Sequence, residues 1–159
     1  MIYRFLDTPI GGLLLARDEA GLRFIEFQKG RRPPRQPATD WDQRDAEFDE
    51  VVKQLTDYFD GRRRRFDLPL APEGTAFQQR VWRALLDIPY GETISYGELA
   101  SRIGQRSASR AVGLANGSNP LPIVIPCHRV IGANGKLTGY AGGLPIKQQL
   151  LALERGALW

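Results

Sequence analysis

Cysteine and histidine each occur only once in this chain of 159 residues. A single cysteine excludes an internal disulfide framework, because every disulfide needs two thiols. One cysteine and one histidine are also too few for the four-ligand zinc sites that are common in small domains. We therefore expect neither a metal nor any other cofactor.

Long apolar runs are absent as well. No stretch approaches the ~18 consecutive apolar residues that a membrane-spanning helix needs. The N-terminal segment Met1–Phe5 leads into neither the apolar core nor the small-residue cleavage site of a secretory signal peptide. We expect a cytoplasmic protein that has no membrane partner.

The formal net charge of +4 is unevenly distributed along the chain. Residues 1–73 hold 13 lysines and arginines against 14 acidic residues, whereas residues 74–159 hold 9 against 4. The cationic second half also contains the lone cysteine, and this coincidence favours an anionic partner for that half. The densest basic run, residues 62–65, lies in the other half, where we expect an exposed loop.

The first half has the pattern of a small α+β unit. Apolar and polar residues alternate as in half-buried strands, and the expected strands are 2–6, 13–16 and 22–27. Residues 29–45 are rich in Arg, Pro and Asp and are expected to form a loop. Apolar residues then recur at helical spacing over 46–59, and residues 61–74 form a connector.

The second half is mostly helical in pattern. Capping boxes at Thr75/Gln78 and Ser95/Glu98 open two helices, and a third is expected over 107–116. The second and third, separated by a short turn, match a helix-turn-helix. We expect residues 121–125 to be a stiff apolar segment in which Pro126 holds residue 125 extended, and a last helix to run from Pro145 to about Glu154.

The lone cysteine and the lone histidine are adjacent, as Cys127 and His128. A thiolate is the attacking form of cysteine, and a neighbouring imidazole can serve as the base that produces it. A free cysteine can equally be a buried structural residue that packs as a small apolar group. From these two residues alone, a nucleophile and an inert core residue remain open.

The sequence around this pair resembles the O6-alkylguanine-DNA alkyltransferase family. The segment Ile125-Pro126-Cys127-His128-Arg129-Val130, together with 110–113, 119–120, 89–100 and 139–144, carries the resemblance over nearly all of residues 75–156. The resemblance implies two lobes in an α+β fold, divided as 1–73 and 74–159. The first would be an RNase H-like lobe with a three-stranded antiparallel sheet and a helix, and the second a mostly helical lobe.

The family resemblance assigns roles by matched position. Cys127 would be the alkyl acceptor, His128 its base through a bridging water, Glu154 the group that orients His128, and Tyr96 a donor to the guanine ring. Asn119 would be a structural hinge between the recognition helix and the active-site segment. The residues expected to contact DNA are Ser109, Arg110, Ala111, Gly113, Asn116 and Tyr96, with Arg110 entering the base stack. Those expected to line the base pocket are Val130, Tyr140, Ala141 and Lys147.

The resemblance implies a DNA repair protein that flips an alkylated guanine out of the duplex. It would take the alkyl group irreversibly onto Cys127, once per molecule, with O4-alkylthymine as a further candidate substrate. The partner would be the minor groove of double-stranded DNA. We expect a monomer in solution, with cooperative assembly on DNA left open.

Two rival functions remain. A helix-turn-helix protein could bind DNA or its lesions without chemistry, with Cys127 buried and inert. A cysteine hydrolase could use Cys127 and His128, although only that pair favours it.

Overall fold

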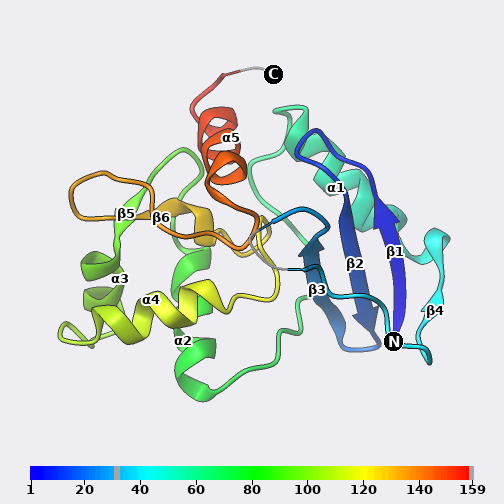
Figure 1. The fold of residues 1–159 in the computed structure, drawn as a ribbon, viewed down its shortest axis with the longest axis horizontal. Helices are drawn as coiled ribbons and strands as arrows, with labels where there is room; N and C mark the ends of the chain where they lie inside the picture. The colour runs from blue at the N-terminus through cyan, green and yellow to red at the C-terminus, as the bar shows by residue number, and fades with distance from the viewer. Residues whose placement is uncertain (31–32, 158–159) are drawn as a thin grey trace.

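The computed structural model describes residues 1–30 and 33–157. Its N-terminal lobe contains a sheet with the strand order β3-β2-β1-β4 (Figure 1). The strands are β1 (Ile2–Leu6), β2 (Leu13–Asp18), β3 (Gly21–Phe27) and β4 (Asp42–Gln43). The first three pair antiparallel, as predicted, whereas β4 pairs in parallel with β1 and was expected to be loop.

The two faces of the sheet are covered by different segments. Behind the sheet in Figure 1 lies α1 (Asp49–Phe59), which joins the core that also contains Leu15 of β2. The helix predicted over 46–59 starts later than expected, because residues 45–48 form a 3-10 turn, η1 (Asp45–Phe48). On the other face, the ring of Phe24 stacks on Trp41 at 6.1 Å, so the loop before β4 covers the sheet.

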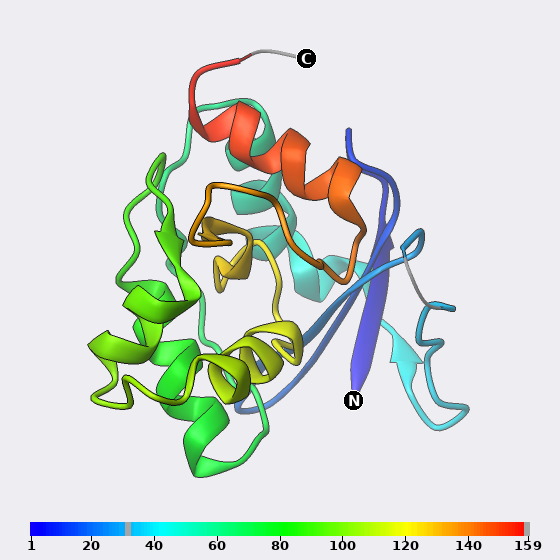
Figure 2. The same ribbon diagram turned by 60° about the vertical axis from the view of Figure 1, so that its left-hand side comes forward.

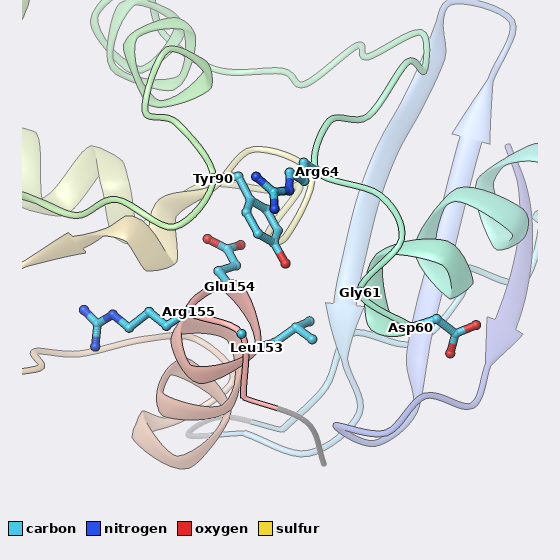
Figure 3. A pocket seen from close by; sticks show the side chains of 8 residues that line it. Asp60, Gly61, Arg64, Tyr90, Leu153, Glu154 and Arg155 are labelled. Carbon is cyan, nitrogen blue, oxygen red and sulfur yellow. The ribbon is translucent and has the colours of Figure 1, made fainter.

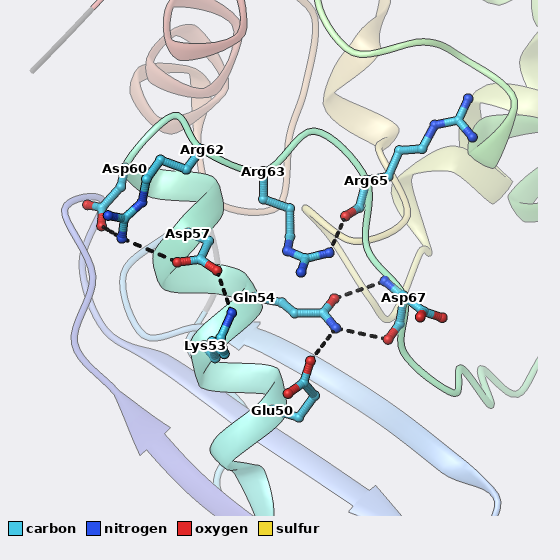
Figure 4. A network of polar contacts seen from close by, with 9 residues as sticks. All are labelled: Glu50, Lys53, Gln54, Asp57, Asp60, Arg62, Arg63, Arg65 and Asp67. Atoms are coloured by element: carbon cyan, nitrogen blue, oxygen red, sulfur yellow. Dashed lines mark hydrogen bonds and ion pairs between the residues drawn. The ribbon is translucent and has the colours of Figure 1, made fainter.

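Polar contacts fix the connector between the lobes to α1 (Figure 4). The Gln54 side chain donates to the Asp67 carbonyl at 2.9 Å, and the Asp67 N–H donates back to Gln54 at 2.9 Å. Arg62 pairs with Asp57 and Asp60 at the end of the helix. The arginine run 62–65 lies in a surface loop, as predicted, and Arg62 is held by acidic neighbours.

The C-terminal lobe contains four α-helices and a short parallel pair of strands among the described residues. These elements are α2 (Ala76–Leu86), β5 (Ile94–Ser95), α3 (Tyr96–Arg102), α4 (Ser109–Gly117), β6 (Val130–Ile131) and α5 (Leu144–Glu154). The helices α3 and α4 form the predicted helix-turn-helix and pack against each other. The α+β fold class predicted from the sequence is confirmed.

The two predicted capping boxes have different outcomes. At Thr75 both halves form, because the Thr75 hydroxyl accepts from the Gln78 N–H while the Gln78 side chain accepts from the Thr75 N–H. At Ser95 only the hydroxyl half forms. The Glu98 carboxylate instead accepts from Arg102 one turn further along, at 3.2 Å.

The segment that leads to the lone cysteine, predicted only as a stiff apolar stretch, contains a tight turn over 122–124. The Ile125 N–H donates to the Leu121 carbonyl at 2.8 Å and closes the turn. Within it Ile123 has φ = 76°, a left-handed conformation that is unfavourable for a β-branched residue. Ile123 is only 1% exposed, so packing around its side chain holds the turn in place.

The lobes share one hydrophobic core and are also joined through their backbones. The N–H of Ile25 in β3 donates to the Pro120 carbonyl, just after α4, at 2.9 Å. Leu22 exchanges backbone hydrogen bonds with Pro69 and Ala71 of the connector, so β3 is not left as an open edge. Figure 2 shows α5 lying across the top of the molecule, between the helical lobe and the sheet.

The complete capping box gives a stability prediction. Replacing Thr75 by Ala should lower the free energy of unfolding by about 1 kcal/mol, because an N–H at the start of α2 loses its acceptor. Thr75→Ser is the matched control and should stay close to wild type, since it keeps the hydroxyl. Urea denaturation followed by circular dichroism measures both, and equal losses would contradict the assignment.

Candidate active site

The lone cysteine is buried at the first position of a short 3-10 helix, η2 (Cys127–Arg129). Cys127 is 6% exposed. Its N–H donates to the Ile125 carbonyl at 2.8 Å, and the Arg129 N–H donates to the Pro126 carbonyl at 3.0 Å. The thiol is therefore carried by a backbone that is fixed on both sides.

Burial raises the pKa of the Cys127 thiol to about 11. A hydrogen bond with the Asn119 side chain and the positive charge of Lys147 act in the opposite direction. The thiol is consequently protonated at neutral pH. A nucleophilic role requires a base that takes this proton as the sulfur reacts.

The adjacent histidine is completely buried and bound to a carboxylate on α5. The Nε2 atom of His128 lies 2.7 Å from Oε2 of Glu154, and both side chains are almost inaccessible to solvent. An ionised carboxylate only accepts hydrogen bonds, so Nε2 carries the ring proton. The other ring nitrogen, Nδ1, is buried and has no hydrogen-bond partner among the described residues, so it is left as an acceptor.

A buried arginine neutralises the charge of this carboxylate. Arg129 donates from Nε to Oε1 of Glu154 at 2.8 Å and from Nη2 to Oε2 at 3.1 Å. A third donor of Arg129, Nη1, reaches the Ile88 carbonyl at 2.6 Å. This two-point contact supplies the paired charge without which a buried carboxylate is costly.

The surroundings set the ionisation of both groups. Burial acts to raise the pKa of Glu154, but hydrogen bonds from His128 and Arg129 outweigh it and lower that pKa well below its ordinary value. Burial lowers the pKa of His128, and the hydrogen bond to Glu154 only partly opposes this. At neutral pH the site therefore holds a carboxylate and a neutral imidazole.

The residues predicted to contact DNA lie mostly on one exposed side of α4. Arg110 and Ala111 are exposed near its start, and Ser109 is exposed as its first residue. Gly113 lies under the ring of Tyr96, where an added Cβ would be 3.7 Å from that ring. The Tyr96 hydroxyl, on α3, is 2.7 Å from the hydroxyl of Thr138.

The structure corrects the prediction that Asn116 contacts DNA. Asn116 is 5% exposed and faces the interior, where its amide donates to the carbonyl of Cys127 at 3.4 Å. Asn119 is also buried: it donates to the Ile125 carbonyl at 2.8 Å and accepts from the Leu121 N–H at 2.9 Å. Both asparagines thus tie the end of α4 to the segment that carries the thiol.

The predicted base-pocket residues surround the segment that follows the thiol. Lys147 of α5 is fully buried and donates to the carbonyls of Val130 at 2.7 Å and Thr138 at 3.0 Å, which fixes this segment. Burial lowers the pKa of Lys147 to about 8.

Tyr140, another predicted base-pocket residue, is buried, and its ring centroid lies 5.5 Å from that of Phe27 in β3. The Tyr140 hydroxyl has no partner among the described residues. Ala141 is exposed.

A cavity of about 350 Å³ opens behind Glu154 (Figure 3). Its lining includes Arg64, Tyr90 and Arg155 but neither Cys127 nor His128. It is therefore separate from the thiol. Among residues 1–30 and 33–157, no three histidine, cysteine or acidic side chains gather as a metal site, and every helix is too short or too polar to cross a membrane.

Two family models together match almost the whole chain. The model described as 6-O-methylguanine DNA methyltransferase, ribonuclease-like domain, matches residues 1–72, and the DNA binding domain of the same family matches residues 76–156. The chain belongs to the 6-O-methylguanine DNA methyltransferase family.

Relatives and a solved structure agree with this membership. The methylated-DNA--protein-cysteine methyltransferase of Methanosarcina acetivorans is 56% identical over 154 residues, covering 97% of this chain and 98% of the relative. The Mycolicibacterium paratuberculosis protein of the same name is 55% identical, covering 96% and 92%. The crystal structure of Mycobacterium tuberculosis OGT in complex with DNA superposes with a TM-score of 0.90 at 51% identity, covering 98% and 93%.

Two contacts of Glu154 had no role in the sequence-based interpretation. Arg129 follows His128 directly, yet no local pattern indicated that its guanidinium turns inward. Tyr58 donates to Oε2 of Glu154 at 2.6 Å from the other lobe. Its place in the apolar stripe of residues 46–59 was a usable signal, because a buried tyrosine hydroxyl normally has a partner.

The carboxylate makes the stability of the protein depend on pH. The pKa of Glu154 is lower in the folded state than its ordinary 4.5. The ionised carboxylate therefore stabilises the folded protein above pH 4.5, and this stabilisation is lost as the pH falls below that value. His128, whose ordinary pKa of 6.5 is also lowered, adds a loss that starts below pH 6.5. We expect the free energy of unfolding to fall as the pH drops from 7 to 3.

Glu154→Gln should flatten the acid part of this curve, with the exposed Glu92→Gln as the control. Urea titrations at a series of pH values provide the measurement. A wild-type slope in the Glu154→Gln variant would show that this carboxylate is not the group responsible.

Proposed function

We propose that the chain repairs DNA by moving an alkyl group, chiefly methyl, from O6 of guanine to the sulfur of Cys127. The carbon–sulfur bond forms as the carbon–oxygen bond breaks, and unmodified guanine is the leaving group. The observation that carries the proposal is the buried pair of His128 and Glu154, in which His128 directly follows the lone cysteine in the sequence of a family member.

The proton of the thiol has a defined acceptor in this scheme. Since Glu154 holds the proton of His128 on Nε2, the free Nδ1 takes the thiol proton, through a bridging water. Glu154 then stabilises the imidazolium that forms. Tyr96 donates to the guanine ring as negative charge develops there and is free to do so once its hydroxyl leaves Thr138.

An inert structural cysteine fits the site less well. Burying a carboxylate, a guanidinium and an imidazole beside a packing residue costs free energy and gains nothing for packing. The same groups are useful where a thiol with a pKa of about 11 must lose its proton during a reaction.

The lesion reaches the thiol only if its nucleotide leaves the base stack. The exposed side of α4 supports entry into the minor groove, because Ala111 and Gly113 leave room for close approach and Arg110 can fill the vacated space. Tyr140, Val130 and Ala141 would line the pocket for the flipped base, with Lys147 holding that segment. Contacts to phosphates and groove shape would then give affinity that falls as salt rises.

The remaining expectations form part of the same proposal. The domains are divided as 1–73 and 74–159, and the protein acts as a monomer in the cytoplasm, where a single free thiol stays reduced. The product is a thioether, which has no activated carbonyl for water to attack. Each molecule therefore reacts once.

Substitution of the acceptor separates chemistry from binding. Cys127→Ser should abolish transfer of labelled methyl from O6-methylguanine in duplex DNA, because a serine hydroxyl is a far weaker nucleophile than a thiol. Binding of the same duplex, measured by fluorescence anisotropy, should be unchanged. Transfer at the wild-type rate by the Ser variant would show that the acceptor is another residue.

Arg110 should matter only when a base must leave the stack. We expect Arg110→Ala to slow repair of duplex DNA about tenfold or more, since extrusion costs a few kcal/mol and loses its replacement group. The reaction with free O6-methylguanine should be little affected. Arg102→Ala, on the neighbouring helix and already paired with Glu98, is the control. Equal losses on both substrates would contradict a role in flipping.

A further inference from the structure

The N-terminal lobe reaches the active site through one side chain. Tyr58, on the last turn of α1, donates its hydroxyl to Oε2 of Glu154 at 2.6 Å. This is the same oxygen that accepts from Nε2 of His128 at 2.7 Å. The contact joins residues 96 positions apart in the chain.

Aromatic packing leaves the Tyr58 ring little freedom. The side chain is completely buried, and its ring centroid lies 5.4 Å from those of Phe59 and Phe66 and 6.2 Å from that of Tyr90. Burial and the nearby Glu154 raise the pKa of Tyr58 well above its ordinary value, so the hydroxyl remains a donor. A rigid donor of this kind fixes the position of the atom that accepts from it.

The geometry at Oε2 of Glu154 explains why the position of this oxygen must be fixed. Arg129 donates hydrogen bonds to both oxygens of Glu154, with its Nη2 atom 3.1 Å from Oε2. His128 must share Oε2 with this guanidinium. A third donor on the other lobe holds the oxygen where the imidazole can still reach it.

We propose that Tyr58 is a positioning residue for alkyl transfer. Its hydroxyl holds Oε2 of Glu154 against Nε2 of His128 and so keeps the imidazole in the tautomer whose Nδ1 can take the thiol proton. The inference rests on the proposed function, in which His128 is the base. It makes the Cys127–His128–Glu154 arrangement incomplete without the N-terminal lobe.

The test replaces Tyr58 by Phe, which keeps the ring and removes only the hydroxyl. We expect the rate of methyl transfer to fall about tenfold, a part of the 10²–10⁴-fold that a well-placed base contributes. The control is Tyr90→Phe, because the Tyr90 hydroxyl makes no hydrogen bond to Glu154 while its ring packs on Tyr58. This control should react at the wild-type rate.

A spectroscopic readout separates positioning from general loss of structure. His128 is the only histidine, so labelling histidine with ¹⁵N reports this ring alone. In the wild type the ring nitrogens should show the neutral tautomer with its proton on Nε2. In Tyr58→Phe the shifts should move toward a mixture of tautomers, whereas in Tyr90→Phe they should not.

The background of Glu154→Gln shows whether the hydroxyl acts through the carboxylate. There Tyr58→Phe should cause little additional loss of rate, because the pair acts as a unit. An equal loss in both backgrounds, or a Tyr58→Phe variant with wild-type rate and wild-type His128 shifts, would overturn the inference. Absence of transfer in the wild type would instead overturn the proposed function, and the tautomer measurement would still decide the role of Tyr58.

Discussion

The rest of the structure depends on the hydrogen bonds that the buried carboxylate of Glu154 accepts. It accepts hydrogen bonds from His128, Arg129 and Tyr58, and these donors come from the segment with the thiol and from the other lobe. A carboxylate can be buried only when charge and hydrogen bonds replace the water it loses. Here those replacements also determine which nitrogen of the imidazole is free.

The helices α5 and α4 hold the segment around Cys127 from two sides. The helix α5 carries Glu154 at its end and Lys147 two turns earlier, so one helix holds both the imidazole and the segment after the thiol. On the opposite side, Asn116 and Asn119 fasten the end of α4 to the backbone around Cys127. The helix α4 is therefore hydrogen-bonded directly to the backbone of Cys127.

The N-terminal lobe is more than a support for the helical lobe. Phe27 at the end of β3 packs on Tyr140, and an added Cβ at Gly142 would lie 3.1 Å from the Phe27 ring. Ile25 of the same strand holds the turn after α4 through Pro120. The lobe thus forms one wall of the region around the thiol, as well as supplying a donor to Glu154.

Local patterns predicted the regular elements well, because strands and helices leave periodic signals in the sequence. The strand β4 is only two residues long and exists through its pairing with β1, which no local pattern reveals. The turn before Cys127 was missed because neighbouring prolines favour extended backbone, while the hydrogen bond from Ile125 to Leu121 and the packing of Ile123 favour a turn.

In the site, the family resemblance predicted the cysteine motif and the pairing of His128 with Glu154, whereas the partner from the N-terminal lobe could not be predicted. Tyr58 could be predicted to face inward from its helical spacing, but not to meet a residue 96 positions away. Asn116 was misplaced although the spacing of Val112 and Ala115 puts it on the buried side of α4. A motif fixes residue types along the chain, whereas the fold decides which atoms meet.

Mass spectrometry of the peptide that contains Cys127 tests the central claim most directly. After incubation with an excess of duplex DNA bearing O6-methylguanine, this peptide should gain the mass of a single methyl group, and the guanine repaired should equal the protein present. An unmodified peptide, or repair of many lesions by each molecule, would contradict the account.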